Sequence, residues 1–263
     1  MSIPKNKMLL TFLGTGTSIG VPVITCDCKV CTSTDKRDKR YRTSAMLEID
    51  NEVFVFDSGP DFRSQMLREK VMNLSAILYT HEHRDHIAGL DDVRAFNYVL
   101  NKRIDLYGTA KTMEMIQTEF PYIFTEQRYF GAPQVNIHEI DEQPFTVNGF
   151  TFTPIKALHG QNQVTGFRIA DLTYITDASF IEAKELEKAK GSKVIVLNAL
   201  RNSKHSSHFS VSEAVEILTA LNPERAFLTH MSHFIGTHAE LEKKLPPFIR
   251  PAYDGLKIEI DYS

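Results

Sequence analysis

The segment His81–His86 (HEHRDH) limits most strongly what this chain can fold into. It places three histidines and one aspartate within six residues. Residues 75–80 before it are apolar enough for a buried strand, and residues 91–100 after it carry apolar side chains at helical spacing. In a buried core, each of these polar groups would need a hydrogen-bond partner, and on a solvent-exposed surface nothing would favour so many histidines together. The pattern therefore predicts a strand-to-helix loop that carries a site, where α/β folds usually place one.

The spacing within this loop suits two metal ions. His81 and His83 lie two residues apart and can aim at one ion. Asp85 and His86 can aim at a second ion, about 3.5–4 Å from the first. Carboxylate ligands admit Mn²⁺ or Fe²⁺, and imidazoles also suit Zn²⁺. We therefore expect two divalent ions, manganese or zinc, at this loop.

Strands alternate with helices along the whole chain, and no linker marks a boundary, so residues 1–263 are predicted to form a single domain. Three further ligand-type side chains directly follow predicted strands, namely His159, Asp177 and His230. Each alone has a structural explanation, since Asp177 could cap a helix that begins near Phe180. Three such residues at strand ends favour metal ligation.

The chain's three cysteines, Cys26, Cys28 and Cys31, lie within six residues of a polar loop. An odd number of cysteines cannot pair fully, and cytoplasmic thiols stay reduced. The C-x-C-x₂-C spacing predicts three thiolate ligands of a structural zinc, which needs a fourth ligand from elsewhere. Redox-active or incidental cysteines are the alternative.

Composition excludes several classes of protein. A chain of 263 residues with 42% hydrophobic residues can bury a core without disulfides. No apolar run reaches the roughly 18 residues of a membrane span, and the N-terminal residues do not resemble a signal peptide. We therefore expect a cytoplasmic protein without a membrane partner. The net charge of −3 argues against a broad nucleic-acid surface.

These motifs resemble the metallo-β-lactamase superfamily of metallohydrolases, from Leu13 to about His233. The resemblance implies a four-layer αββα sandwich, in which two mixed sheets face each other with helices outside and metals at one edge. It implies that Asp57 braces the metal loop and that Asp177 bridges both ions. The remaining implied ligands are His81, His83 and His159 for one ion, and Asp85, His86 and His230 for the other.

Within that superfamily the chain looks most like the PhnP-type phosphodiesterases. The opening Leu13–Pro22 (LGTGTSIGVP) and the cysteine-rich loop at about residues 22–42 carry this likeness. It implies that His233 completes the structural zinc site, three residues after His230. It also implies an active-site histidine at His208, with His205 as an alternative.

The implied activity is binuclear metal-dependent hydrolysis of a small phosphodiester, such as a cyclic sugar or nucleotide phosphate, by a metal-bridging hydroxide. Asp177 would orient the nucleophile, while Asp85 would hold a metal. His208 would protonate the leaving group or donate a hydrogen bond to a phosphate oxygen. Homodimers are common in the family, so a homodimer is an expectation for this chain.

Other interpretations stay open. A tRNase Z-like RNA 3′-end endonuclease shares the histidine motif, although we find no glycine- and proline-rich tRNA arm. A cyclic-nucleotide phosphodiesterase would use similar chemistry. A third interpretation is a non-catalytic metal-binding protein of the same fold, but it does not explain why the full set of ligands is retained. The basic run Lys36–Arg42 could present Arg40 or Arg42 to a phosphate, although most such runs are solvated loops.

Overall fold

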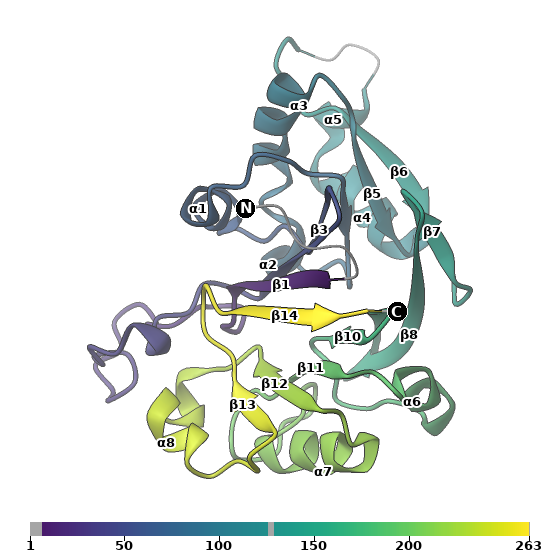
Figure 1. Cartoon of the computed structure of the whole chain (residues 1–263). Helices are drawn as coiled ribbons and strands as arrows, with labels where there is room; N and C mark the ends of the chain where they lie inside the picture. Colours follow the sequence, from purple (N-terminus) through teal and green to yellow (C-terminus); the bar gives the residue numbers. More distant parts are fainter. Residues whose placement is uncertain (1–6, 126–128, 263) are drawn as a thin grey trace.

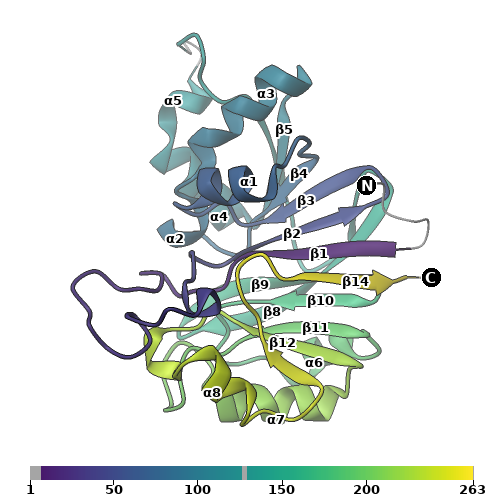
Figure 2. The same ribbon diagram turned by 60° about the vertical axis from the view of Figure 1, so that its left-hand side comes forward.

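The computed structural model describes residues 7–125 and 129–262. Two sheets of seven strands lie face to face, and helices cover the outer face of each sheet (Figures 1 and 2). The strand order is β14-β1-β2-β3-β4-β5-β6 in the first sheet and β13-β12-β11-β10-β9-β8-β7 in the second. The predicted four-layer αββα sandwich is therefore confirmed.

The strands of the first sheet are β1 (Lys7–Gly14), β2 (Ser44–Ile49), β3 (Glu52–Phe56), β4 (Ala76–Leu78), β5 (Ile104–Gly108), β6 (Val135–Glu139) and β14 (Lys257–Asp261). Those of the second are β7 (Phe145–Val147), β8 (Phe150–His159), β9 (Asn162–Ile169), β10 (Leu172–Ile175), β11 (Val194–Asn198), β12 (Arg225–Thr229) and β13 (Ile249–Pro251).

The helices outside the first sheet are α1 (Phe62–Glu69), α2 (Arg84–Ile87), α3 (Arg94–Leu100), α4 (Ala110–Glu119) and α5 (Pro121–Phe124). Those outside the second sheet are α6 (Ala183–Ala189), α7 (Val211–Leu221) and α8 (His238–Glu242). Single 3₁₀ turns are η1 (Lys36–Asp38), η2 (Leu90–Val93) and η3 (His233–Ile235). None of the described helices is both long enough and apolar enough to cross a bilayer.

Parallel strand pairs determine where a site can form. Strands β3 to β6 run parallel to one another, and so do β10 to β13. The carboxyl ends of parallel strands share one edge of a sheet, where the loops that follow can meet. The loops after β3, β4, β10 and β12 carry Asp57, His81, Asp177 and His230.

The core between the sheets is aromatic. The ring of Phe56 stacks on that of Tyr174, with centroids 4.7 Å apart, and on that of Phe167 at 5.8 Å. Strand β3 contributes Phe54 and Phe56 to this inner core, while Val53 and Val55 face the helices. The near-continuous apolar run of this strand is therefore buried on both faces.

Strands β13 and β14 each form one edge of a sheet, and charged side chains protect the edge of β14. Arg225 donates a hydrogen bond to the carbonyl oxygen of Glu259 at 2.6 Å, and Lys193 donates to that of Asp261 at 3.2 Å. Both carbonyls belong to β14, which has a sheet neighbour on one side only. These cations block the strand edge against pairing with another chain.

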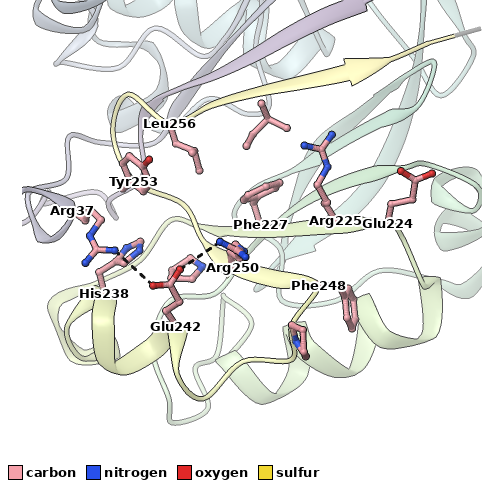
Figure 3. Close-up of a pocket in the computed structure, with 13 residues that line it drawn as sticks. Arg37, Glu224, Arg225, Phe227, His238, Glu242, Phe248, Arg250, Tyr253 and Leu256 are labelled. Atoms are coloured by element: carbon pink, nitrogen blue, oxygen red, sulfur yellow. Dashed lines mark ion pairs between the residues drawn. The ribbon is translucent and has the colours of Figure 1, made fainter.

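A cavity of about 490 Å³ lies between the same two edges (Figure 3). Phe227 and Leu256 line its apolar part. On its rim, Glu242 pairs with Arg37 at 3.7 Å and with Arg250 at 4.0 Å. No metal-ligand residue of the histidine motif lines it, so it is separate from the site described below.

Some helix limits differ from the sequence prediction. The helix predicted to begin near Phe180 begins at Ala183, so Asp177 is not its N-cap. Helix α7 begins at a capping box that Ser210 and Glu213 form. Strand β14 was missed, although its residues 257–261 alternate regularly between exposed and buried.

We expect Phe56→Ala to lower the free energy of unfolding by about 3–5 kcal/mol, because it leaves a void beneath two aromatic rings. Chemical denaturation would measure this change. The matched control, Phe130→Ala, removes a ring that is 98% exposed and should change stability by less than about 0.5 kcal/mol. Similar losses in both variants would contradict the prediction.

Candidate metal centre

The histidine motif lies on the turn between β4 and α2, as predicted. His83 is the N-cap residue of α2, and Asp85 and His86 lie in its first turn. The loop after β3 packs directly against this turn. A Cβ atom at Gly59 would lie 2.1 Å from the carbonyl oxygen of Asp85, so only glycine allows this approach.

One carboxylate oxygen stands at the centre of the site. Oδ2 of Asp177 lies 3.0 Å from Nε2 of His230, 3.2 Å from Nε2 of His86 and 3.8 Å from Nε2 of His81. Oδ2 of Asp85 lies 3.2 Å from the same nitrogen of His86. Asp177 can therefore reach both of the ligand groups that the resemblance implies.

The structure gathers the expected ligands into two groups whose donor atoms lie within 4.8 Å of one another. The first group is His81, His83 and His159. The second group is Asp85, His86, Asp177 and His230. His159 and Asp177 also form a third, overlapping group with His208.

The buried nitrogens of this cluster fit divalent ions. Nε2 of His86 and Nε2 of His230 are buried and have no hydrogen-bond partner. An unsatisfied buried polar atom costs about 1–3 kcal/mol, so several at one place need an explanation. Converging imidazole nitrogens and carboxylate oxygens are the ligands of Zn²⁺ and Mn²⁺. This donor set could therefore hold divalent metal ions.

The imidazoles of the site fall into two sets. Burial opposes protonation of His86 and His230, but Asp177 and Asp85 beside them raise the pKa of both imidazoles, that of His230 to about 9, so metal binding there would displace protons. Burial lowers the pKa of His81 and of His83, which favours the neutral imidazole that metals require. Burial opposes ionisation of Asp177, but His230 and His86 beside it hold the pKa of its carboxyl well below the usual range. The carboxylate is therefore charged.

Asp57 orients two of the imidazoles. Its carboxylate accepts hydrogen bonds from Nδ1 of His86 at 2.8 Å, from Oγ1 of Thr80 at 2.9 Å and from N of Thr80 at 2.8 Å. Because Oγ1 of Thr80 donates to Asp57, it accepts from Nδ1 of His81 at 3.0 Å. Both histidines therefore carry their proton on Nδ1 and present Nε2 to the cluster. Sequence reasoning missed Thr80.

Three site residues adopt the left-handed backbone conformation directly after a strand. The φ angles are 64° at Asp57, 60° at Asp177 and 55° at His230. This conformation is unfavourable for most residues and is tolerated best by Asn, Asp and His. Such strain at one edge of the sheets turns each side chain inward to the cluster and is typical of functional sites.

His208 lies inside the centre and His205 lies outside it. The His208 ring is 4.4 Å from the His159 ring and 4.7 Å from the His230 ring. Burial, reinforced by His230, lowers the pKa of His208 to about 2. His205 is half-buried, and its ring lies 5.4 Å from that of His208. Of the two, His208 is therefore placed to meet a bound substrate.

The cysteine loop forms a second cluster. The Sγ atoms of Cys26, Cys28 and Cys31 lie 3.3, 3.5 and 3.5 Å from Nδ1 of His233. Zinc bonds of about 2.3 Å to sulfur and about 2.1 Å to nitrogen in a tetrahedron give an S···N separation of about 3.6 Å. These four residues therefore match the geometry of a structural zinc site.

The two arginines of the basic run Lys36–Arg42 that could have contacted a phosphate are both bound to other residues of the protein. Arg40 is 4% exposed and donates to Oγ1 of Thr15 and to the carbonyl oxygen of Ala252. The hypothesis that Arg40 contacts a phosphate is therefore wrong. Arg42 is paired with Asp61 at 3.1 Å.

The glycine-rich turn after β1 lies beside the segment that follows His230, because N of Thr17 donates to the carbonyl oxygen of Met231.

We expect Asp57→Asn to weaken metal binding by about 10–100-fold, because the amide would place a donor against Nδ1 of His86. Competition with a chelator would measure the affinity, and circular dichroism would verify folding. Asp141→Asn on an exposed turn is the matched control. A folded Asp57→Asn protein with unchanged affinity would contradict the bracing role.

Cys28→Ser should remove about one equivalent of tightly bound zinc per chain and lower the thermal midpoint, because a thiolate ligand is lost. Elemental analysis and calorimetry would measure both. Thr32→Ala in the same loop is the control and should retain the zinc. Full zinc content in the Cys28→Ser protein would overturn the assignment.

Comparison with known proteins supports the same family. The model of the beta-lactamase superfamily domain matches residues 53–231, which is more than half of the chain. A solved structure described as a new diphosphatase from the PhnP family has a TM-score of 0.91 and 38% identity, covering 97% of this chain and 98% of that chain.

Two curated relatives are longer. An octanoyltransferase from Porphyromonas gingivalis is 35% identical over 257 residues, which are 97% of this chain and 52% of that protein. A ribonuclease Z from Nostoc sp. is 30% identical over 190 residues, which are 70% of this chain and 53% of that protein. The chain thus spans about half the length of the curated relatives it matches. By its sequence, fold and converging His/Asp side chains, it belongs to the metallo-β-lactamase superfamily of metal-dependent hydrolases.

Proposed function

We propose that this protein is a binuclear metal-dependent phosphodiesterase acting on a small phosphodiester. The observation that carries the proposal is the position of Asp177, whose Oδ2 atom lies within 3.8 Å of imidazoles from both ligand groups. A shared carboxylate of this kind is suited to a pair of ions. The similarity to a PhnP-family diphosphatase at 38% identity supports phosphorus chemistry.

Two bound divalent ions would supply a water of lowered pKa and would neutralise charge on the phosphate. The residues that would hold them are His81, His83, His159, Asp85, His86, His230 and the shared Asp177. Asp57 keeps the proton on Nδ1 of His86, so that Nε2 stays available. Oxygen ligands admit manganese and nitrogen ligands suit zinc, while the cysteine cluster suits zinc.

His208 is the proposed proton donor. Its ring is 8% exposed and stands against His159 and His230, so solvent does not compete for it. At neutral pH its low pKa leaves a neutral imidazole, which still donates one N–H to a phosphate oxygen. A bound phosphate anion raises the pKa of an adjacent imidazole, which favours transfer of a proton to the leaving oxygen.

The longer relatives suggest other substrates. RNA cleavage is supported by the ribonuclease Z likeness, and acyl transfer by the octanoyltransferase likeness. Each of those names describes a protein of which this chain covers about half. Neither an RNA partner nor a membrane partner is part of the proposal, and the homodimer stays a prediction. The three reduced thiols favour the cytoplasm as the location.

Hydrolysis of bis(p-nitrophenyl) phosphate by metal-stripped protein resupplied with Mn²⁺ or Zn²⁺ tests the proposal. Asp85→Ala should abolish turnover, because it removes a ligand. With phosphodiester substrates whose leaving group is an alkoxide, His208→Ala should reduce kcat about 100-fold or more. With bis(p-nitrophenyl) phosphate the loss should be smaller, because p-nitrophenolate leaves without a proton. His138→Ala, on the distant strand β6, is the matched histidine control and should keep full activity.

The same protein would be assayed with an octanoyl thioester and with a tRNA precursor. Metal-dependent turnover of the phosphodiester that depends on Asp85 supports the proposal. No phosphodiester turnover by a protein shown to hold its metals, with cleavage of the thioester or of the tRNA instead, would replace it with that activity.

A further inference from the structure

Strand β11 ends at a buried asparagine that binds the turn after β10. The parallel pairing of these two strands stops at Ile175 and Leu197, one residue before Asn198. The side chain of Asn198 is fully buried, and its Oδ1 atom accepts a hydrogen bond from N of Ala178 at 2.7 Å. Its Nδ2 atom donates to the carbonyl oxygen of Ala178 at 2.9 Å. Asn198 therefore holds both polar main-chain groups of the residue that follows Asp177.

These two hydrogen bonds help to set where the Asp177 carboxylate points. Asp177 adopts the left-handed conformation, with a φ of 60°, so its side chain leaves the direction of the strand. Its Oδ1 atom accepts from the hydroxyl of Thr176 at 2.6 Å, while Oδ2 faces the imidazoles of the cluster. A side-chain amide carries acceptor and donor atoms in one plane, so it matches an N–H group and a carbonyl group together. A strained turn persists only where its surroundings fix it, and Asn198 fixes this one through Ala178.

The carbonyl oxygen of Ala178 also connects this turn to the loop that carries His208. N of Phe209, the residue after His208, donates to that oxygen at 2.8 Å. Within the same loop the carbonyl oxygen of Ser207 accepts from Nδ1 of His159 at 2.6 Å, so the loop orients a proposed metal ligand. The turn of the shared carboxylate and the loop of the proposed proton donor therefore meet at one atom, beside the asparagine amide.

On its other side, β11 is joined to the segment that carries His230. N of Ala199 donates to the carbonyl oxygen of Thr229, directly before His230, at 2.9 Å. Asn198 and Ala199 therefore lie between the two loops that bring Nε2 of His230 and Oδ2 of Asp177 to 3.0 Å from each other. A displacement at Asn198 would change that separation, because both loops are hydrogen-bonded to this short segment.

We propose that Asn198 is a positioning residue of the metal centre. It holds Asp177, His208 and His230 at the separations that two bound ions and a substrate require. Both polar atoms of its side chain bind Ala178, so it acts on the centre through the main chain of its neighbours. This inference rests on the proposed two-ion function. Without the amide, N of Ala178 would be a buried donor that has lost its acceptor, and the turn would relax away from the cluster.

Asn198→Leu tests the proposal, because it removes both hydrogen bonds and keeps the branching of the side chain. In protein whose cysteine cluster is filled with zinc, we expect the affinity of the centre for Mn²⁺ to fall about 10–100-fold. Competition with a chelator would measure this affinity, and the visible absorption spectrum of bound Co²⁺ would report a changed ligand geometry. With bis(p-nitrophenyl) phosphate at saturating Mn²⁺, kcat should fall about tenfold or more while KM changes less, because misplaced groups slow the reaction more than they weaken binding.

Asn97→Leu is the matched control, because Asn97 on α3 makes the same kind of contact. It is 9% exposed, its Oδ1 atom accepts from N of Gln134 at 2.9 Å, and its Nδ2 atom donates to the carbonyl oxygen of Gln134 at 2.8 Å. Gln134 precedes β6, so this contact lies at the amino ends of the parallel strands, whereas the metal centre lies at their carboxyl ends. Asn97→Leu should lower stability to a similar extent and leave the Mn²⁺ affinity and the Co²⁺ spectrum unchanged.

Asn198→Asp keeps the proposal testable if Asn198→Leu does not fold. The ionised carboxylate would set an oxygen atom against the carbonyl oxygen of Ala178, whereas the protonated carboxyl would donate to it and restore both hydrogen bonds. Burial raises the pKa of such a carboxyl. The ratio of the variant's Mn²⁺ affinity to that of the wild-type protein should therefore be about 0.1 or less at about pH 8, and it should rise about fivefold or more by about pH 6.

The outcomes separate this proposal from the proposed function. If the wild-type protein with a filled cysteine cluster binds fewer than two further ions, or binds them and hydrolyses no phosphodiester, the proposed function fails. If it binds two ions and Asn198→Leu retains their affinity, or if Asn97→Leu weakens binding as much, the positioning role is overturned while the proposed function stands. A constant affinity ratio for Asn198→Asp between the two pH values would overturn the positioning role as well.

Discussion

The hydrogen bonds of one buried carboxylate, Asp57, hold the centre together. They join the end of β3 to the end of β4 through Thr80, and to α2 through His86. Through the hydroxyl of Thr80 the same carboxylate also fixes His81. One side chain therefore sets the tautomer of one imidazole in each ligand group. A buried carboxylate with fewer partners would be strongly unfavourable, so the loop geometry and the carboxylate require each other.

The second sheet positions its ligands with the same backbone conformation that the first sheet uses at Asp57. Asp177 follows β10 and His230 follows β12, and both residues take the left-handed conformation that Asp57 takes after β3. In each case the strand places the residue at the common edge, and the reversed φ turns the side chain from the strand direction to the cluster. Local strain at three positions is tolerated because parallel pairing and aromatic packing behind them fix the strands.

Much of this centre was predictable from the sequence, and some of it was not. The spacings in His81–His86 and in Cys26–Cys31 predicted two ligand clusters, because each depends only on residues that are close in the sequence. The sandwich and the partition of ligands came from the family resemblance, since periodicity does not tell which strands become neighbours. Strand β14 pairs with β1 from the opposite end of the chain. The contact between Ser207 and His159 is equally non-local, which is why no sequence pattern indicated it.

His230 and His233 lie only three residues apart in the sequence, which affects the order in which the protein can bind its metals. These residues belong to different clusters, and the partners of His233 are cysteines near the N-terminus. During synthesis, the thiolates leave the ribosome some two hundred residues before the histidine that completes their site. Neither cluster is complete until this one segment has emerged, so stable metal loading cannot precede its synthesis. The two centres would therefore mature together, once the segment with His230 and His233 has been synthesised.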